Sequence, residues 1–147
     1  RVPELIQRVR KILGTDRVSK VLLVGAGNLG RALSAFRGFK KRGFELVAVF
    51  DKDPSKVGET TSGPESLVIQ SVAEMPRVVK RHGIRLGILA VPAEAAPQVA
   101  EEMVAAGVRA ILNFAPVNLQ VGGDIRVASV DLAIHLEQLS FQLAGGG

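Results

Sequence analysis

The clearest signal of the fold lies in residues 21–30, Val21-Leu22-Leu23-Val24-Gly25-Ala26-Gly27-Asn28-Leu29-Gly30. It opens with a continuous apolar run, which is typical of a strand buried on both faces of a parallel sheet. A glycine-rich turn of the pattern G-x-G-x-x-G follows, and apolar residues at helical spacing continue from Leu29 to Phe36. Phe44–Phe50 then reads as a second strand. This order predicts two parallel strands joined by a crossover helix.

Strands and helices alternate along the rest of the chain. We expect short strands or extended pieces at Leu67–Ile69 and Ile125–Val127, longer strands at Leu86–Val91 and Ala110–Phe114, and helices from about Met75 to Arg81 and over Ala93–Ala106. The intervening segment Asp53–Pro64, rich in Ser, Thr, Gly and Pro, predicts a loop. The alternation predicts an α/β fold with a doubly wound, mostly parallel sheet and right-handed crossovers.

Composition narrows the class of protein. A chain of 147 residues with 47% apolar and 22% charged residues fits one packed domain. Its apolar runs are far shorter than the roughly 20 residues of a membrane-spanning helix, so no membrane contact is expected. The absence of cysteine excludes disulfides and thiolate chemistry, and no secretory segment opens the chain, so we expect the cytoplasm. The net charge of +5 favours anionic partners without naming one.

The glycine-rich turn has the features of a dinucleotide site. Gly25 permits a tight turn, Gly27 lets the backbone approach a pyrophosphate, and Gly30 lets the helix pack close to the strand. The backbone amides of Asn28 and Leu29 would point toward the phosphates at the start of the helix. The alternative is a glycine turn that serves packing alone.

Asp51 closes the second strand about 20 positions after the last glycine, the spacing at which a carboxylate takes the ribose hydroxyls. A fixed carboxylate repels a 2′-phosphate, so we expect NAD(H) to be preferred over NADP(H). The neighbouring Lys52 could shield such a phosphate, but its flexible, solvated stem gives this less weight. The alternative is a surface aspartate without a ligand.

The nicotinamide half of the cofactor is expected where later strands end. In an open parallel sheet the ligand lies along the carboxyl ends of the strands, at the switch in strand order. Val91-Pro92 and Asn113-Phe114-Ala115-Pro116 lie at the carboxyl ends of two of these strands. Asn113 could hydrogen-bond the carboxamide or simply form a turn, and both interpretations stay open. With Gly25-Ala26-Gly27-Asn28-Leu29-Gly30, Asp51 and Lys52, these residues form the predicted cofactor site.

The sequence lacks three common catalytic and nucleotide-hydrolysis motifs. The sequence contains no H-E-x-x-H, no G-x-S-x-G and no P-loop. His82 precedes a glycine at a predicted helix end, where it would interact with the helix dipole, and His135 is expected at a surface or interface. We therefore predict no catalytic residue and no metal ligand, and we expect a sensor rather than an enzyme.

The predicted last helix, from Asp131 to Leu143, is apolar on two faces. Leu132, Leu136, Leu139 and Leu143 form one stripe, while Ile134 and Phe141 lie opposite. The second face is expected to meet another chain, which predicts a two-fold homodimer. The alternative is a helix wedged within its own chain.

Three segments follow from these patterns. They are a basic amphipathic helix with its linker at residues 1–18, a dinucleotide-binding domain at 19–128, and a dimerisation helix with its tail at 129–147.

Further stretches carry a family resemblance. Val21–Leu33, Phe50–Gly58 with F-D-K-D-P-S-K-V-G, Ile111–Pro116 with I-L-N-F-A-P, and Val130-Asp131 together resemble the redox-sensing transcriptional repressors of the Rex family. The resemblance implies a Rossmann-like domain in a homodimer that binds NADH more tightly than NAD⁺ and leaves its operator DNA when NADH accumulates. It also implies that the last helix is exchanged between protomers, and that Asp131 lies near the nicotinamide and takes part in the switch.

The sequence departs from the family pattern in two ways. Family members carry an N-terminal winged-helix domain that reads DNA, and this chain begins where the Rossmann-like part would begin. We favour a part of a longer chain over a relative that has lost DNA binding, and we expect no specific operator binding by these residues alone. Phe36 stands where better-known members have a tyrosine, which leaves the response of Asp131 to NADH open.

Two other classes of function share this architecture. A coenzyme-A-binding domain of an acyl-CoA ligase would not require Asp51. A small NAD-dependent dehydrogenase fragment would turn over an oxidisable substrate. Calorimetry with NADH, NAD⁺, NADPH and coenzyme A separates most of these hypotheses.

Overall fold

The computed structural model describes residues 19–34, 43–61 and 66–130 of the chain. Several predictions fall outside these ranges. They concern the basic segment 1–18, Phe36, the exchanged helix 131–143, and Asp131 and His135 within that helix.

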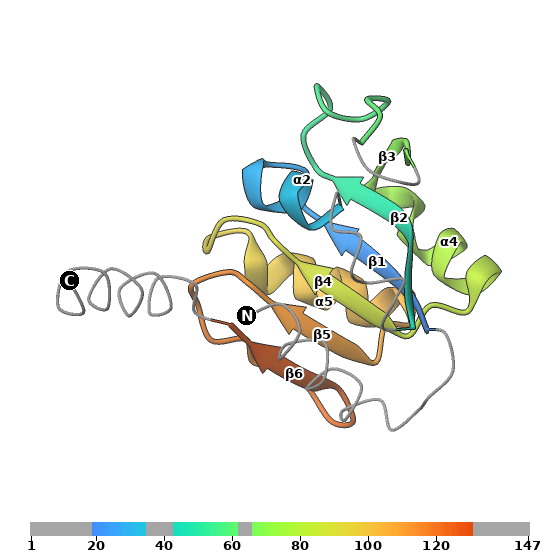
Figure 1. Ribbon diagram of the computed structural model, residues 1–147. Helices are drawn as coiled ribbons and strands as arrows, with labels where there is room; N and C mark the ends of the chain where they lie inside the picture. The colour runs from blue at the N-terminus through green and yellow to red at the C-terminus, as the bar shows by residue number, and fades with distance from the viewer. Residues whose placement is uncertain (1–18, 35–42, 62–65, 131–147) are drawn as a thin grey trace, which may run out of the picture.

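The described residues form one six-stranded sheet in the order β3-β2-β1-β4-β5-β6 (Figure 1). All neighbouring strands are parallel. The strands are β1 (Ser19–Val24), β2 (Phe44–Asp51), β3 (Ile69–Ser71), β4 (Leu86–Leu89), β5 (Ala110–Asn113) and β6 (Arg126–Ser129). The chain first builds outward from β1 to β3, then returns to the other side of β1 with β4. The predicted doubly wound α/β fold is thus confirmed, with the switch in strand order between β1 and β4.

Helices cover the two faces of this sheet. They are α2 (Asn28–Ser34), the 3₁₀ turn η1 (Val72–Glu74), α4 (Met75–His82) and α5 (Ala96–Ala106). Leu33 of α2 packs in one buried cluster, and α4 and α5 contribute to a second cluster on the opposite face. Ser71 starts η1 by accepting a hydrogen bond from the Ala73 amide.

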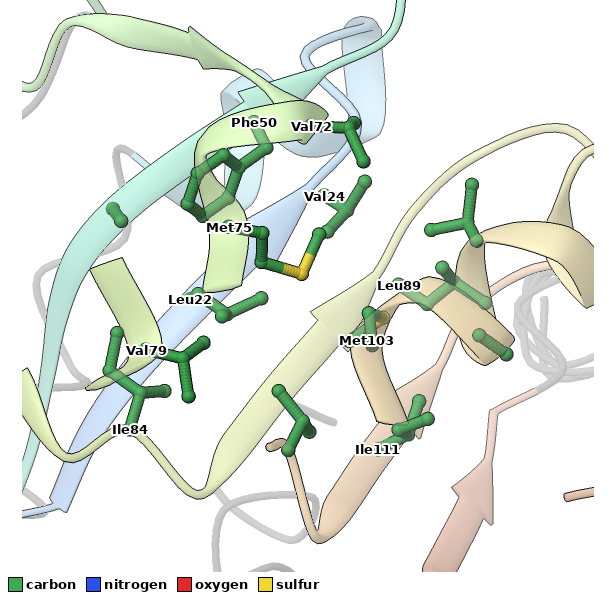
Figure 2. Close-up of a cluster of buried hydrophobic side chains, with 14 of the residues drawn as sticks. Leu22, Val24, Phe50, Val72, Met75, Val79, Ile84, Leu89, Met103 and Ile111 are labelled. Carbon is green, nitrogen blue, oxygen red and sulfur yellow. The ribbon is translucent and has the colours of Figure 1, made fainter. Parts of the chain in front are cut away.

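Alternate residues of β1 enter different clusters, so this strand is buried on both faces. Leu22 and Val24 belong to the cluster under α4 and α5, and Val21 and Leu23 to the cluster on the α2 side. Figure 2 shows the cluster under α4 and α5, in which Met103 of α5 packs with residues of the strands. The continuous apolar run of β1 follows from this double burial. It also fixes the end of β1, and hence the glycine-rich turn, at the middle of the sheet.

The element boundaries differ from the sequence predictions in places. The third strand is Ile69–Ser71 rather than Leu67–Ile69. Val68 instead forms an antiparallel bridge with Thr60, which lies in the loop between β2 and β3 (the returning loop). The helix expected from Ala93 begins at Ala96, since the preceding residues form a turn in which the amides of Ala95 and Ala96 donate to the carbonyl of Pro92. Pro97 lies in the first turn, where it is tolerated.

Three strands also end or begin elsewhere than predicted. β4 and β5 are shorter, ending at Leu89 and Asn113, and β6 covers Arg126–Ser129 instead of Ile125–Val127. The pairing of β6 with β5 decides its bounds, and sequence alternation in so short a piece does not reveal that pairing.

Candidate functional site

The glycine-rich turn begins where β1 meets the ends of two neighbouring strands. Gly25 has a φ of 113°, and its amide donates a 2.8 Å hydrogen bond to the carbonyl of Phe50 in β2. A Cβ at this position would lie 2.2 Å from the carbonyl oxygen of Ala90, just beyond β4. Both the backbone conformation and the space therefore require glycine here.

The other two glycines of the motif have opposite surroundings. A Cβ on Gly30 would lie 1.8 Å from the carbonyl oxygen of Gly25, so α2 packs directly on the turn. A Cβ on Gly27 would meet nothing within 4 Å, although the carbonyl of Gly27 already accepts the Arg31 amide at 2.8 Å. Gly30 is thus required by the fold itself, whereas the space over Gly27 is open to a ligand.

Asp51 joins the glycine-rich turn to the loop after β2. Its Oδ2 accepts a 2.7 Å hydrogen bond from the Ala26 amide, and its Oδ1 accepts a 2.8 Å bond from the Asp53 amide. Each carboxylate oxygen can accept a further hydrogen bond. The carboxylate is therefore fixed in place beside the turn and keeps acceptor capacity for hydroxyl groups.

A second aspartate shapes the loop that follows β2. Oδ1 of Asp53 accepts hydrogen bonds from the backbone amide and the hydroxyl of Ser55, at 2.9 and 2.8 Å. These bonds, the one from the backbone first, together with the positive charge of Lys56, hold the pKa of Asp53 below its ordinary value. This loop thus carries a second ionised carboxylate close to Asp51 in sequence.

The ammonium group of Lys52 lies against α5. Its Nζ lies 3.0 Å from Oε1 of Glu102 in α5, and each side chain is 38% exposed. The structure therefore brings Asp51 together with the glycine-rich turn, while the ammonium group of Lys52 is engaged by a helix.

The residues after β4 and β5 lie at the same edge of the sheet as the turn, because all the strands are parallel. Of those predicted to line the nicotinamide half, Val91 is half-buried, Phe114 and Ala115 are buried, and Pro92 and Pro116 are exposed. The predicted nicotinamide-lining residues therefore lie at the carboxyl edge of the sheet but differ in their exposure to solvent.

Asn113 is fully buried, and its amide is engaged by its own chain. Its Oδ1 accepts from the Ala115 amide at 2.9 Å, and its Nδ2 donates to the carbonyl of Val117 at 3.0 Å and to Oγ of Ser129 at 3.4 Å. These bonds show Asn113 forming the turn after β5, one of the two roles considered from the sequence. A contact with a cofactor carboxamide stays a prediction.

Sequence reasoning missed a cavity of about 450 Å³ beside the glycine-rich turn. Its lining comes from the start of α2, from β2 and β3, and from the returning loop: Ala26, Gly30, Arg31, Val49, Gly58, Glu59, Thr60, Thr61 and Ile69. Arg31 and Glu59 approach to 3.5 Å across these elements. The loop was predicted, but its return along β3 depends on the Thr60–Val68 pairing, for which the sequence gives no signal.

The described ranges show neither a metal site nor a membrane span. Within residues 19–34, 43–61 and 66–130, no group of three or more His, Asp or Glu side chains is placed to hold a metal ion. Among the helices of the described ranges, none has the length and apolar character needed to cross a membrane.

The strand order and this turn define the class of protein: a Rossmann-like nucleotide-binding domain. Residues 16–117 match the family model described as a CoA binding domain. The redox-sensing transcriptional repressor Rex of Desulforamulus reducens is 48% identical over 143 residues, which are 97% of this chain and 67% of that protein. The chain belongs to the Rex family of redox-sensing transcriptional repressors.

Solved structures agree with this assignment. The chain is similar to RSP, a Rex-family repressor, in its complex with β-NADH, with a TM-score of 0.79, 34% identity and coverage of 99% of this chain and 69% of that one. It is also similar to RSP in complex with β-NAD⁺ and operator DNA, with a TM-score of 0.77, 34% identity and coverage of 99% and 65%. The chain thus spans about two-thirds of the length of these repressors.

The hydrogen bonds of Asn113 lead to a stability prediction. Asn113→Ala leaves the buried Ala115 amide and the Val117 carbonyl without this partner, so we expect a loss of about 2–3 kcal/mol in the free energy of unfolding. Urea denaturation measures the loss. Ser129→Ala removes only the 3.4 Å bond and serves as the control, with an expected loss below about 1 kcal/mol. Equal losses for the two variants would contradict the structural role of Asn113.

Proposed function

We propose that this chain is the NAD(H)-binding and dimerising region of a redox-sensing repressor. The observation that carries the proposal is the fixed Asp51 carboxylate beside a glycine turn whose Gly27 is open to a ligand. The family supports it, since a Rex-family repressor has been solved with β-NADH and, with β-NAD⁺, on operator DNA. The chain would act in the cytoplasm, as expected for a regulator of transcription, and would catalyse no reaction.

The residues of the turn fit a dinucleotide. The backbone of Gly25-Ala26-Gly27-Asn28-Leu29-Gly30 would hold the diphosphate, because the first amides of a helix lack partners within the helix. Asp51 would accept from the ribose hydroxyls. Bound NADH would supply a nicotinamide whose charge depends on its redox state.

The nicotinamide half would lie at the carboxyl ends of β4 and β5. Val91-Pro92 and Phe114-Ala115-Pro116 would line it, with Asn113 shaping the turn that presents them. Asp131, which lies outside the described residues, would respond to the nicotinamide as the family resemblance implies. NADH would thereby favour the dimer state that releases DNA, and a tenfold preference between redox states corresponds to about 1.4 kcal/mol. Operator DNA would be read by a winged-helix domain outside this chain.

Coenzyme A is the second candidate ligand, because the matched family model is described as a CoA binding domain. The two ligands make different demands on Asp51. A dinucleotide uses its carboxylate at the ribose, whereas coenzyme A does not require it. Titrations of NADH and coenzyme A into Asp51 variants therefore distinguish the two ligands.

Titration calorimetry tests the role of Asp51. We expect NADH to bind more tightly than NADPH or coenzyme A, because the carboxylate accepts from free ribose hydroxyls and repels a 2′-phosphate. Asp51→Asn keeps an acceptor for the turn but removes the charge, so NADH should weaken by about tenfold and the rejection of NADPH should relax. Asp51→Ala should do the same, with an added loss of stability from the Ala26 and Asp53 amides. Unchanged titrations of both nucleotides, or coenzyme A binding best, would refute this role.

The second and third glycines of the motif, Gly27 and Gly30, separate the effects on binding from those on folding. Gly27→Ala adds a Cβ that meets no protein atom, so stability should change by less than about 1 kcal/mol while NADH affinity falls, because the diphosphate loses its close approach. Gly30→Ala pushes α2 away from the Gly25 carbonyl and should cost about 2 kcal/mol or more. Thermal unfolding and NADH titration on both variants measure the difference. Full NADH affinity in Gly27→Ala would count against a diphosphate at the turn.

The homodimer is proposed from the two apolar faces of the last helix. Replacing both Leu136 and Leu139 by Asp places charge on one apolar stripe, and we expect monomers by analytical ultracentrifugation. Replacing the exposed Val57 and Val68 by Asp gives the same change of charge elsewhere and should leave the dimer intact. A stable dimer in the first variant would disprove assembly through this helix.

A further inference from the structure

The ion pair between Lys52 and Glu102 connects the loop after β2 with α5. The Nζ to Oε1 distance is 3.0 Å, which makes an ion pair without hydrogen-bond geometry, and this oxygen of Glu102 is itself shielded from solvent although the side chain as a whole is 38% exposed. In the described part of the chain, Lys52 is the one cation within 4 Å of this oxygen. The position of the ammonium group is therefore set by α5 and not by the cofactor site.

The place of Lys52 in the chain gives this pair its significance. A lysine directly after the ribose-binding carboxylate is within reach of a 2′-phosphate, which a positive charge would attract. Here the neighbouring side chains left at the ribose position are both acidic: Asp51 is fixed by the turn, and Asp53 is exposed. With Lys52 drawn toward α5, a 2′-phosphate would meet these two negative charges without the lysine that directly follows Asp51, while Lys56 lies beside Asp53 and Arg31 is paired with Glu59.

We propose that Glu102 is a positioning residue that makes the site selective for a dinucleotide with a free ribose 2′-hydroxyl, by holding the ammonium group of Lys52 on α5. This inference rests on the proposed binding of NAD(H). It extends that proposal to a residue of α5, on the opposite face of the sheet from α2. Selectivity then has two parts: repulsion by Asp51, and removal of the cation that would offset it.

The test compares NADH and NADPH titrations of variants of the whole chain. Glu102→Gln releases Lys52, and NADPH should bind about fivefold more tightly, the change that corresponds to about 1 kcal/mol for one exposed ion pair. NADH, which has no 2′-phosphate, should be unaffected. Glu101→Gln makes the same change of charge at the adjacent, exposed position of α5 and should leave both affinities as they are. The gain in NADPH affinity should shrink as salt is added.

A second variant shows whether Lys52 carries the effect. In Lys52→Met combined with Glu102→Gln, the gain in NADPH affinity should disappear. Three outcomes would refute the role of Glu102 while leaving NADH binding intact. They are an unchanged NADPH affinity in Glu102→Gln, the same gain in NADPH affinity in Glu101→Gln, and a gain that persists when Lys52 is replaced. If the unchanged chain does not bind NADH, the proposed function fails and this inference fails with it.

Discussion

The hydrogen bond from the Ala26 amide to the Asp51 carboxylate is the contact on which the site depends. It joins the turn after β1 to the end of β2 at a distance of 2.7 Å, at the centre of the parallel sheet. The Asp53 amide holds the other oxygen, so the carboxylate is oriented before any ligand arrives. A group fixed in this way loses little conformational entropy on binding, and its charge excludes anions at one defined place. In the function we propose, this one side chain would serve both recognition of the ribose and selectivity against a 2′-phosphate.

The glycines around this contact divide into those the fold needs and one it does not. Gly25 and Gly30 are packed against backbone carbonyls, and a side chain at either would separate elements that carry the turn. Gly27 has no such neighbour. A residue left small without a packing reason is understandable where something else approaches the backbone. Because a Rex-family repressor has been solved in complex with β-NADH, we propose the cofactor diphosphate as that occupant.

The sequence predicted the local features well and the long-range side-chain contacts poorly. The run Val21–Val24, the glycine pattern and the spacing to Asp51 are local signals, and the structure has the strand, turn and sheet order that they imply. Lys52 is different, because its partner, Glu102, is distant in the chain. Residue type and spacing state what such a side chain can do but not which neighbour engages it. The bounds of β3 and β6 differ from the sequence predictions for the same reason, because pairing with another segment of the chain sets them.

We propose that reduced dinucleotide binds over the glycine-rich turn, against Asp51. Amide NMR during a titration with NADH tests it most directly, because the reporting groups are backbone amides of the site itself. The resonances of Ala26, Gly27 and Asp53 should shift together and saturably, whereas those at the amino ends of the strands should not. Shifts confined to other parts of the sheet, or no shift at these three amides at saturating NADH, would contradict it.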